Sequence, residues 1–450
     1  MKRLLIIFAA LFASSIQPVA VDAQIRIATF DVDASPPIGS PLAYDPTTGV
    51  QDPLSCKGLI LFSDQKPIVL CSVDWLGIAN DAQREFKQAF AKAAGTSPDR
   101  VVIHTIHQHD APRCDLTAES ILSQYGEGGK NYDVKFCRSV IKKAAEKIKS
   151  AIHTAQNVTH IGLGQGEVKK VASNRRILGK DGKVKVTRYT ATRDPKVRAM
   201  PVGTIDPMLK SISFWKNEKA LVVLTFYATH PQSYYRTGKA STDFPGLARN
   251  AREKATGVPH IHFNGAGGNI GAGKWNDGAK TNRAVLARKV ETGMQLALEN
   301  TQKTVIDAKS LKWKTSSVQL PIGKTLVEER QIQTLENAKE TQSNKLYAAK
   351  HLSWIRRSRE KQGVPLSCLQ INNSKTLFVA GELFVEYQLE AQSMDKDSFV
   401  AMAAYGEYGM GYIGTAISYS QGGYESSPRA SRVGPGSEKI LMDAFRELLE

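Results

Sequence analysis

Residues 101–112 read VVIHTIHQHDAP, an apolar and β-branched run that leads directly into two histidines. The run is typical of a buried strand. Because residues two apart in an extended chain point to the same side, His107 and His109 can converge on one ion or one substrate. His104 faces the other way and is expected to be a hydrogen-bonded histidine of the core. This stretch predicts a strand that carries a polar site at its end.

The segments around this strand alternate between strand and helix patterns. Strand-like runs lie at 67–75, 101–106 and 160–166, and helical spacing occupies 81–94 and 132–155. This order predicts an α/β sheet. We expect further strands at 209–215, 220–228, 259–263, 366–371 and 376–380, and further helices at 281–299, 327–361 and 438–449. The basic, proline-containing segment 170–207 is expected to form long loops over a site. No repeat or linker divides the chain, so one domain is expected over 24–450.

The N-terminus predicts export. Lys2 and Arg3 precede an apolar run over 4–13, and Val21-Asp22-Ala23 is a small-residue cleavage pattern. Residues 1–23 are therefore interpreted as a signal peptide, and the mature protein as secreted or periplasmic. No cysteine follows the cleavage pattern, so no lipid anchor is expected, and no later stretch is apolar enough to span a membrane.

The charge indicates which partners the surface favours. The formal net charge is +17. Such a surface favours anionic partners such as an acidic glycan or a phospholipid membrane surface. Export argues against nucleic acid as the partner.

The cysteines do not form a recognisable pattern. The five are Cys56, Cys71, Cys114, Cys137 and Cys368. Without CxxC spacing they indicate neither a zinc ribbon nor a disulfide framework, and an odd number leaves at least one free thiol. A nucleophilic Cys114 is one alternative.

A glycine-rich stretch, GAGGNIGAGKWND at 265–277, has the glycine and lysine spacing of a phosphate-binding loop between Gly268 and Lys274. That loop requires a Ser or Thr after the lysine and a helix that opens there. Trp275 occupies the position instead, and a helix can begin only near Ala279. The stretch is therefore interpreted as a glycine-rich turn after a strand.

Other histidines also follow strand patterns. His230 ends an apolar run and precedes Pro231, which places an imidazole at the usual edge of an α/β cleft. His260 and His262 repeat the HxH spacing just before the glycine stretch. Each of these, taken alone, is either a ligand or an ordinary polar residue at a strand end. Together they favour a metal site, and whether His260 and His262 join it is left open.

Several segments, in the same order, resemble the neutral/alkaline, non-lysosomal ceramidases. The stretch IHQHDAP at 106–112 is similar to that family's THTHSGP. The other matching segments are DVDASPP at 31–37, SVD at 72–74, Asn174-Arg175, THPQS at 229–233, GEL at 381–383, GYIGT at 411–415 and GYE at 423–425. The resemblance implies an α/β, mixed-sheet catalytic domain of the neutral ceramidase type. The chain stops where those enzymes continue into an immunoglobulin-like C-terminal domain, which is expected to be lacking.

The resemblance also implies site residues. It assigns the metal ligands to His107, His230, Glu382 and Tyr412, which would bind Zn²⁺. Imidazole and carboxylate are ordinary zinc ligands that leave a position for water. The residues implied around the reacting carbonyl are His109, Arg175 and Tyr424. Without the resemblance, Glu382 would be interpreted as a solvated acid in a turn, and the two tyrosines as core aromatics.

One departure from the family concerns the substrate. The glycine stretch aligns with a segment that carries a serine required for activity, and Gly271 stands at that position. Asn269, Gly271 and Arg176 are expected in the substrate pocket. We predict an exported zinc-dependent hydrolase that cleaves an amide or ester with metal-activated water. Its substrate is expected to be a small, polar or acidic acylated compound, such as an acylated sugar. The alternatives are a true ceramidase and a non-catalytic binding protein that keeps the fold.

Overall fold

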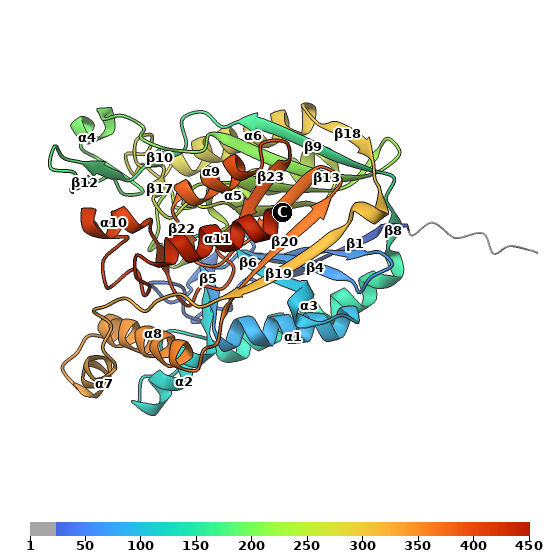
Figure 1. The fold of residues 1–450 in the computed structure, drawn as a ribbon. Helices are drawn as coiled ribbons and strands as arrows, with labels where there is room; N and C mark the ends of the chain where they lie inside the picture. The colour runs from blue at the N-terminus through green and yellow to red at the C-terminus, as the bar shows by residue number, and fades with distance from the viewer. Residues whose placement is uncertain (1–23) are drawn as a thin grey trace, which may run out of the picture.

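Two mixed five-stranded sheets form the centre of the molecule (Figure 1). A computed structural model describes residues 24–450, so the predicted signal peptide lies outside the described residues. The first sheet has the order β6-β4-β3-β1-β8, and the second has the order β16-β14-β13-β9-β18. The strands of the first are β1 (Arg26–Asp33), β3 (Ser55–Phe62), β4 (Ile68–Val73), β6 (Val101–Thr105) and β8 (Gln156–Asn157). Those of the second are β9 (His160–Glu167), β13 (Met208–Lys216), β14 (Lys219–Tyr227), β16 (His260–Asn264) and β18 (Gln302–Val305).

Helices cover the outer faces of the two sheets. Helices α1 (Asp81–Ala94) and α3 (Val134–Ala151) lie on the first sheet, and α5 (Asp243–Thr256) and α6 (Asn282–Glu299) lie on the second (Figure 1). The inner faces share one apolar core, to which the first sheet contributes Leu59 and Leu70 and the second contributes Leu224 and Phe263. The result is a four-layer α/β/β/α arrangement, which confirms the predicted α/β class.

A third sheet, of the order β19-β20-β21-β23, is formed by the C-terminal part of the chain. Its strands are β19 (Lys312–Val318), β20 (Val364–Ile371), β21 (Ser374–Phe378) and β23 (Phe399–Ala403). Helices α9 (Val385–Met394) and α11 (Ser437–Leu449) pack on it. Each of the three sheets contains one parallel pair, namely β4–β6, β14–β16 and β21–β23.

Most predicted elements are present, but two predictions about segments were wrong. The helix predicted over 327–361 is two helices, α7 (Glu328–Glu336) and α8 (Gln342–Arg359). Thr341 accepts a hydrogen bond from Asn344 N and thereby starts a new helix after a turn. The segment 170–207 is less irregular than predicted, because it contains β10 (Ser173–Asn174), β11 (Arg176–Leu178), β12 (Val184–Thr187) and the short α4 (Pro195–Ala199). Within residues 24–450, no helix is long and apolar enough to cross a lipid bilayer.

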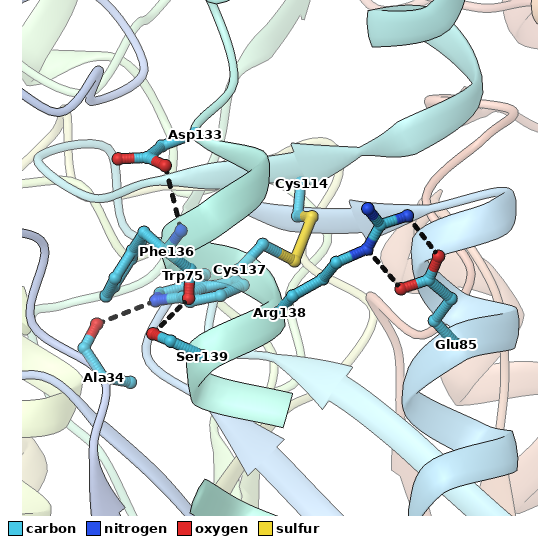
Figure 2. The surroundings of a disulfide bond; sticks show 9 residues. All are labelled: Ala34, Trp75, Glu85, Cys114, Asp133, Phe136, Cys137, Arg138 and Ser139. Carbon is cyan, nitrogen blue, oxygen red and sulfur yellow. Dashed lines mark hydrogen bonds and ion pairs between the residues drawn. A yellow bond between two sulfur atoms is a disulfide. The ribbon is translucent and has the colours of Figure 1, made fainter. Parts of the chain in front are cut away.

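A disulfide corrects the interpretation of the cysteines. Cys114, in β7 (Arg113–Asp115), is bonded to Cys137 in α3, as Figure 2 shows. Asp133 fixes the start of α3 by accepting a hydrogen bond from Phe136 N at 2.9 Å. Cys114 is therefore not a free nucleophile, and one disulfide is present although the spacing indicated no disulfide framework. The remaining cysteines, Cys56, Cys71 and Cys368, are free and buried.

Candidate metal centre and substrate cavity

Two histidines leave the sheets where parallel strands end. His107 follows β6 and His230 follows β14, and each of these strands has a parallel neighbour. In open α/β sheets, the carboxyl ends of such strands form the crevice in which ligands bind. His107 has a φ of +65°, which few non-glycine residues adopt, and its N–H donates to Trp75 O at 3.0 Å. The backbone thus turns sharply and holds the His107 imidazole at the edge of the sheet.

Glu382 and Tyr412 are brought together by the register of two short strands. β22 (Glu382–Leu383) pairs in parallel with β24 (Tyr412–Ile413), and Glu382 lies directly opposite Tyr412. Each strand follows a glycine with a positive φ, Gly381 at +73° and Gly411 at +68°. A Cβ at Gly411 would lie 2.4 Å from Ala430 O, so this close approach requires glycine. Glu382, which spacing alone places in a solvated turn, is buried.

Three buried acceptor atoms face one another without hydrogen-bond partners among the described residues. They are His107 Nε2, His230 Nδ1 and Glu382 Oε2. Glu382 Oε2 lies 3.2 Å from His107 Nε2 and 3.9 Å from His230 Nδ1. Buried polar atoms are rarely left unpaired, so this arrangement is suited to hold a cation.

The outer hydrogen bonds leave these atoms free to ligate. His107 Nδ1 lies 2.6 Å from Leu76 O and therefore carries the proton, which leaves the lone pair on Nε2. Tyr408 OH donates to Glu382 Oε1 at 2.5 Å and orients the carboxylate. The ring of Tyr412 stacks on the ring of His230, with 6.3 Å between the two ring centres. His107, His230, Glu382 and Tyr412 together are called the metal group below. The residues present thus fit a divalent ion with nitrogen and oxygen ligands.

A second set of three, formed by His107, His109 and His230, also has ligand atoms close enough to hold a metal, all within 4.8 Å of one another. In the structure, however, both ring nitrogens of His109 already have hydrogen-bond partners. His109 Nδ1 lies 2.9 Å from Tyr44 OH, and its Nε2 lies 2.9 Å from His230 Nε2. The set containing Glu382 therefore fits better, because its three ligand atoms lack partners and include a negative charge.

The environment favours neutral imidazoles at His109 and His230 and an ionised carboxylate at Glu382. Burial, together with the charge of His107, lowers the pKa of His109 and of His230 well below the ordinary value. Burial raises the pKa of Glu382, but the proximity of His107 and the hydrogen bond from Tyr408 outweigh burial and lower that pKa. Burial and the Glu382 charge raise the pKa of Tyr412 well above its ordinary value. Neutral imidazoles and a carboxylate are the forms that bind metal.

A cavity of about 860 Å³ opens onto this group. His109, His230, Arg175 and Tyr412 lie in its wall. The aromatic residues of the wall are Tyr44, Tyr189, Tyr235, Tyr347, Tyr412 and Tyr424, and the basic ones besides Arg175 are Arg113, Lys130, Arg236 and Arg429. Asp45 is the one carboxylate of the lining among residues 24–450. The cavity is thus aromatic, polar and basic.

The two adjacent arginines have different surroundings. Arg175 is buried in the cavity wall, where its Nη1 donates to Tyr412 OH at 3.3 Å. Arg176 turns away from the cavity and donates to Ser418 O at 3.1 Å. Both pair with the buried Glu425, each at 3.2 Å. Of the two, only Arg175 is placed to contact a substrate beside the metal group. The Tyr424 ring lies 5.9 Å from that of Tyr412.

The glycine stretch lies beside the metal group and does not line the cavity. Gly268 N donates to Leu383 O at 2.8 Å, and a Cβ at Gly268 would lie 2.4 Å from Glu382 O. The small residues are needed because this loop packs against the backbone of Glu382. Helix α6 begins only at Asn282, which confirms that this is not a phosphate-binding loop.

The two pocket residues predicted in this stretch have structural contacts. Asn269 Nδ2 donates to Glu386 at 2.8 Å, and its Oδ1 accepts from Val385 N, which fastens the loop to α9. Gly271, in β17 (Ile270–Gly271), pairs with Ser173 and lies beneath Arg175. A Cβ at Gly271 would lie 3.4 Å from the Arg175 Cγ and Cδ atoms. Gly271 therefore reaches the cavity only through Arg175.

His104 belongs to the core and not to the site. His104 is buried, and its Nδ1 lies 2.8 Å from Ala404 O, as predicted for a core histidine.

Three residues of the site were not predicted from the sequence. Tyr44 contacts His109, Tyr408 contacts Glu382, and Glu425 contacts Arg175. For Tyr408 and Glu425 there was a signal, because they lie near Tyr412 and next to Tyr424 in the chain. For Tyr44, which is far from every motif, there was none.

Comparison with known proteins shows which solved structures share this fold. No family model and no curated protein matches the sequence. The structure of neutral ceramidase from Pseudomonas aeruginosa superposes with a TM-score of 0.70 and 15% identity, over 95% of this chain and 74% of that chain. This chain has the neutral-ceramidase fold. A structure described as ceramidase complexed with C2 gives a TM-score of 0.67 and 14% identity, over 95% of this chain and 75% of that one. The predicted ceramidase-like, mixed-sheet architecture is thus confirmed.

Proposed function

We propose that this protein is an exported, zinc-dependent hydrolase that cleaves an amide or ester bond of a small acylated compound. One observation carries the proposal. The unpartnered atoms of His107, His230 and Glu382 converge where His230 reaches the wall of a large cavity, beside a neutral imidazole that is not needed as a ligand. This is the arrangement that a metal-assisted hydrolase requires. Tyr412 would complete the ligand set.

The chemistry of the site divides between the ion and the side chains. Zinc, when bound, supplies a Lewis acid that polarises the acyl carbonyl and lowers the pKa of water. His109 lies in the cavity wall, and Tyr44 OH holds its Nδ1 at 2.9 Å, so that its Nε2 faces the metal group. Once substrate displaces the 2.9 Å contact between His109 Nε2 and His230 Nε2, this neutral imidazole can accept a proton at Nε2 and return it to the leaving group.

Arg175 and Tyr424 are suited to bind the acyl oxygen. Arg175 is rigidly placed, because Glu425, Tyr412 OH and Gly268 O hold three sides of its guanidinium group. A fixed cation close to the metal group stabilises negative charge that develops on an oxygen. The Tyr424 hydroxyl, in the same wall, offers a second donor.

The substrate class follows from the cavity wall. Tyrosines and basic side chains dominate it, and few aliphatic side chains are available to hold long hydrocarbon tails. A polar or acidic acyl compound, such as an acylated sugar, matches this lining better than ceramide does. The fold favours the second candidate, a neutral ceramidase. The net charge of +17 is compatible with an anionic glycan or membrane surface near the substrate.

Export is supported by two features. The N-terminal pattern at 1–23 is that of a signal peptide. The Cys114–Cys137 disulfide is of a kind that persists in the periplasm or outside the cell.

The test is a screen of the purified protein against N-acyl and O-acyl sugars and a fluorogenic ceramide. We expect turnover of at least one acylated sugar, its loss in chelator and its return with zinc. The His230→Ala variant serves as the control and should be inactive throughout. Binding of these compounds without turnover in the zinc-loaded protein would favour the non-catalytic alternative.

A further inference from the structure

A second, much smaller cavity lies behind the metal group. Its volume is about 10 Å³, which is close to the space that one water molecule needs. Arg113, Lys350 and Arg432 line it, and they come from β7, from α8 and from the segment before α11. Tyr132, Asp115 and Tyr408 complete the wall. Three cationic side chains from distant parts of the chain therefore meet around one small space.

None of these three cations forms an ion pair with a carboxylate within residues 24–450. Arg113 and Arg432 each donate one hydrogen bond to a neutral oxygen, at 3.4 Å and 3.2 Å. The Lys350 ammonium faces the rings of Tyr347 and Tyr408, each at 5.8 Å. Arg432 is buried and Arg113 and Lys350 are half-buried, and cations withdrawn from water without a counter-charge are costly.

The carboxylate in the wall is already engaged. Asp115 accepts hydrogen bonds from Asn80 Nδ2 and from Ala118 N, both at 3.0 Å, and caps the helix α2 (Leu116–Gln124). A charge used in this way balances at most one of the three cations. The cavity therefore keeps an excess of positive charge.

Donor groups without partners surround the same space. Tyr132 OH, Arg432 Nε and Arg113 Nε are buried and have no hydrogen-bond partner among the described residues. The Tyr132 side chain is only 2% exposed, and that of Arg432 only 3%. All three groups donate, so the missing partner is an acceptor.

We propose that this cavity binds a single halide ion, chloride under ordinary conditions. The excess of positive charge requires an anion, and the unpartnered donors supply its hydrogen bonds. A volume this small favours a monatomic anion over sulfate, phosphate or a substrate carboxylate. The flexible four-carbon stem of Lys350 can adjust to the larger radius of chloride.

The assignment requires a protonated Lys350, which its surroundings without an anion disfavour. Burial, and then the charges of Arg113 and Arg432, lower the pKa of Lys350 well below its ordinary value. A bound anion opposes this shift and keeps the ammonium charged. The rival arrangement is a neutral Lys350 amine beside a water molecule.

The ion would also support the metal group from behind. Tyr408 lies in the wall of the small cavity, and its hydroxyl donates to Glu382 Oε1. Arg113 lies in the walls of both cavities. A halide that holds these side chains would fix the orientation of the Glu382 carboxylate. The binding itself does not depend on the proposed function.

The test measures thermal stability of the full chain in sodium chloride and in sodium gluconate at the same ionic strength. We expect chloride to raise Tm by at least about 2 °C, since it binds only the folded state. Lys350→Met should abolish this increment. Lys345→Met, on the same helix but paired with Glu127 at 2.9 Å, should retain it.

Bromide provides the second measurement. Crystals grown in bromide should show an anomalous peak among Arg113, Lys350 and Arg432. Chloride can also bind zinc, so a peak found only beside His107 and His230 would overturn the proposal. Equal Tm values in chloride and gluconate would overturn it as well, and would indicate a neutral Lys350.

Discussion

Two HxH pairs, His107 with His109 and His260 with His262, have the same spacing and different surroundings. The first pair follows the end of β6, in a segment where the backbone turns at a positive φ. The second pair lies inside β16, where His260 is paired with Val223 and His262 with Thr225 of the neighbouring strand. All four side chains are buried.

The carboxylate makes the difference between the pairs. His107 Nε2 faces Glu382 Oε2 at 3.2 Å, whereas no carboxylate of residues 24–450 lies within 4.0 Å of either imidazole of the second pair. Burial lowers the pKa of His260 to about 4 and that of His262 to about 3, so both are neutral core side chains. Spacing along a strand therefore does not identify a metal site. Position at the end of a strand and an opposing acid do.

The largest effect is expected from removing a ligand. His230→Ala should lose its zinc and fall to the uncatalysed rate, because the ion supplies the Lewis acid. His262→Gln, which removes an imidazole of similar burial, should keep both zinc and activity in the folded fraction. The measurements are elemental analysis and turnover of the best substrate. Full zinc occupancy in His230→Ala would show that His230 is not a ligand, and would make His260 and His262 the better candidates.

His109 should affect rate without affecting metal. His109→Ala is expected to keep zinc and to lose about two to four orders of magnitude in kcat, the usual contribution of general acid–base catalysis. Zinc content and kcat are measured on the same preparation. Loss of zinc as complete as in His107→Ala would make His109 a ligand and favour the set of three histidines.

Removing the ion pair between Asp74 and Arg249 should lower the stability of the protein. Arg249 forms two hydrogen bonds to Asp74, at 2.7 and 2.8 Å, and Gln108 donates to the Asp74 carbonyl. Asp74→Asn leaves a buried guanidinium unpaired, so a loss of about 3–5 kcal/mol in the free energy of unfolding is expected. Denaturant titration at pH 7 measures this loss. A loss below about 1 kcal/mol would show that the pair does not support the site.

The same ion pair sets a pH dependence. Burial raises the pKa of Asp74, but the charge and hydrogen bonds of Arg249 outweigh burial and bring the pKa below its ordinary value of 3.8. A depressed folded pKa means that the stabilisation is present above the unfolded pKa and is lost as pH falls through the folded one. The difference between native protein and Asp74→Asn should therefore persist down to about pH 4 and shrink below it. A difference that shrinks already between pH 7 and 5 would contradict this.

The smallest effect is expected at Gly271. A serine there would contact the Arg175 stem, since its Cβ would lie 3.4 Å from Cγ and Cδ. Gly271→Ser should keep zinc and shift the ratio of ceramide to sugar-amide turnover by about tenfold, because it changes recognition and not the metal ligands. Parallel kcat/KM measurements test this. Efficient ceramide turnover by the native protein, unimproved by serine, would favour the plain ceramidase.

The sequence predicted local elements well because their signals are local. Helix α1 was predicted at its observed bounds, since Ala82, Phe86 and Phe90 repeat at helical spacing and Gly95 ends it in a left-handed conformation. The long helix over 327–361 was wrong because a polar surface helix carries little periodicity across its break at Thr341.

The site was harder to predict, because its contacts are not local. The pairing of Glu382 with Tyr412 depends on two-residue strands, and that of Cys114 with Cys137 depends on how α3 packs. Spacing cannot supply either. The resemblance to ceramidases supplied Glu382 and Tyr412, but it did not indicate that Arg176 turns away from the cavity.

The central claim is that one zinc ion lies between His107, His230, Glu382 and Tyr412. Diffraction data collected above and below the zinc absorption edge, from crystals of the native protein, test it most directly. We predict one full-occupancy anomalous peak within ligand distance of His107 Nε2, His230 Nδ1 and a Glu382 oxygen, with His109 outside it. A peak bound by His109 in place of Glu382, or one at His260 and His262, would contradict it.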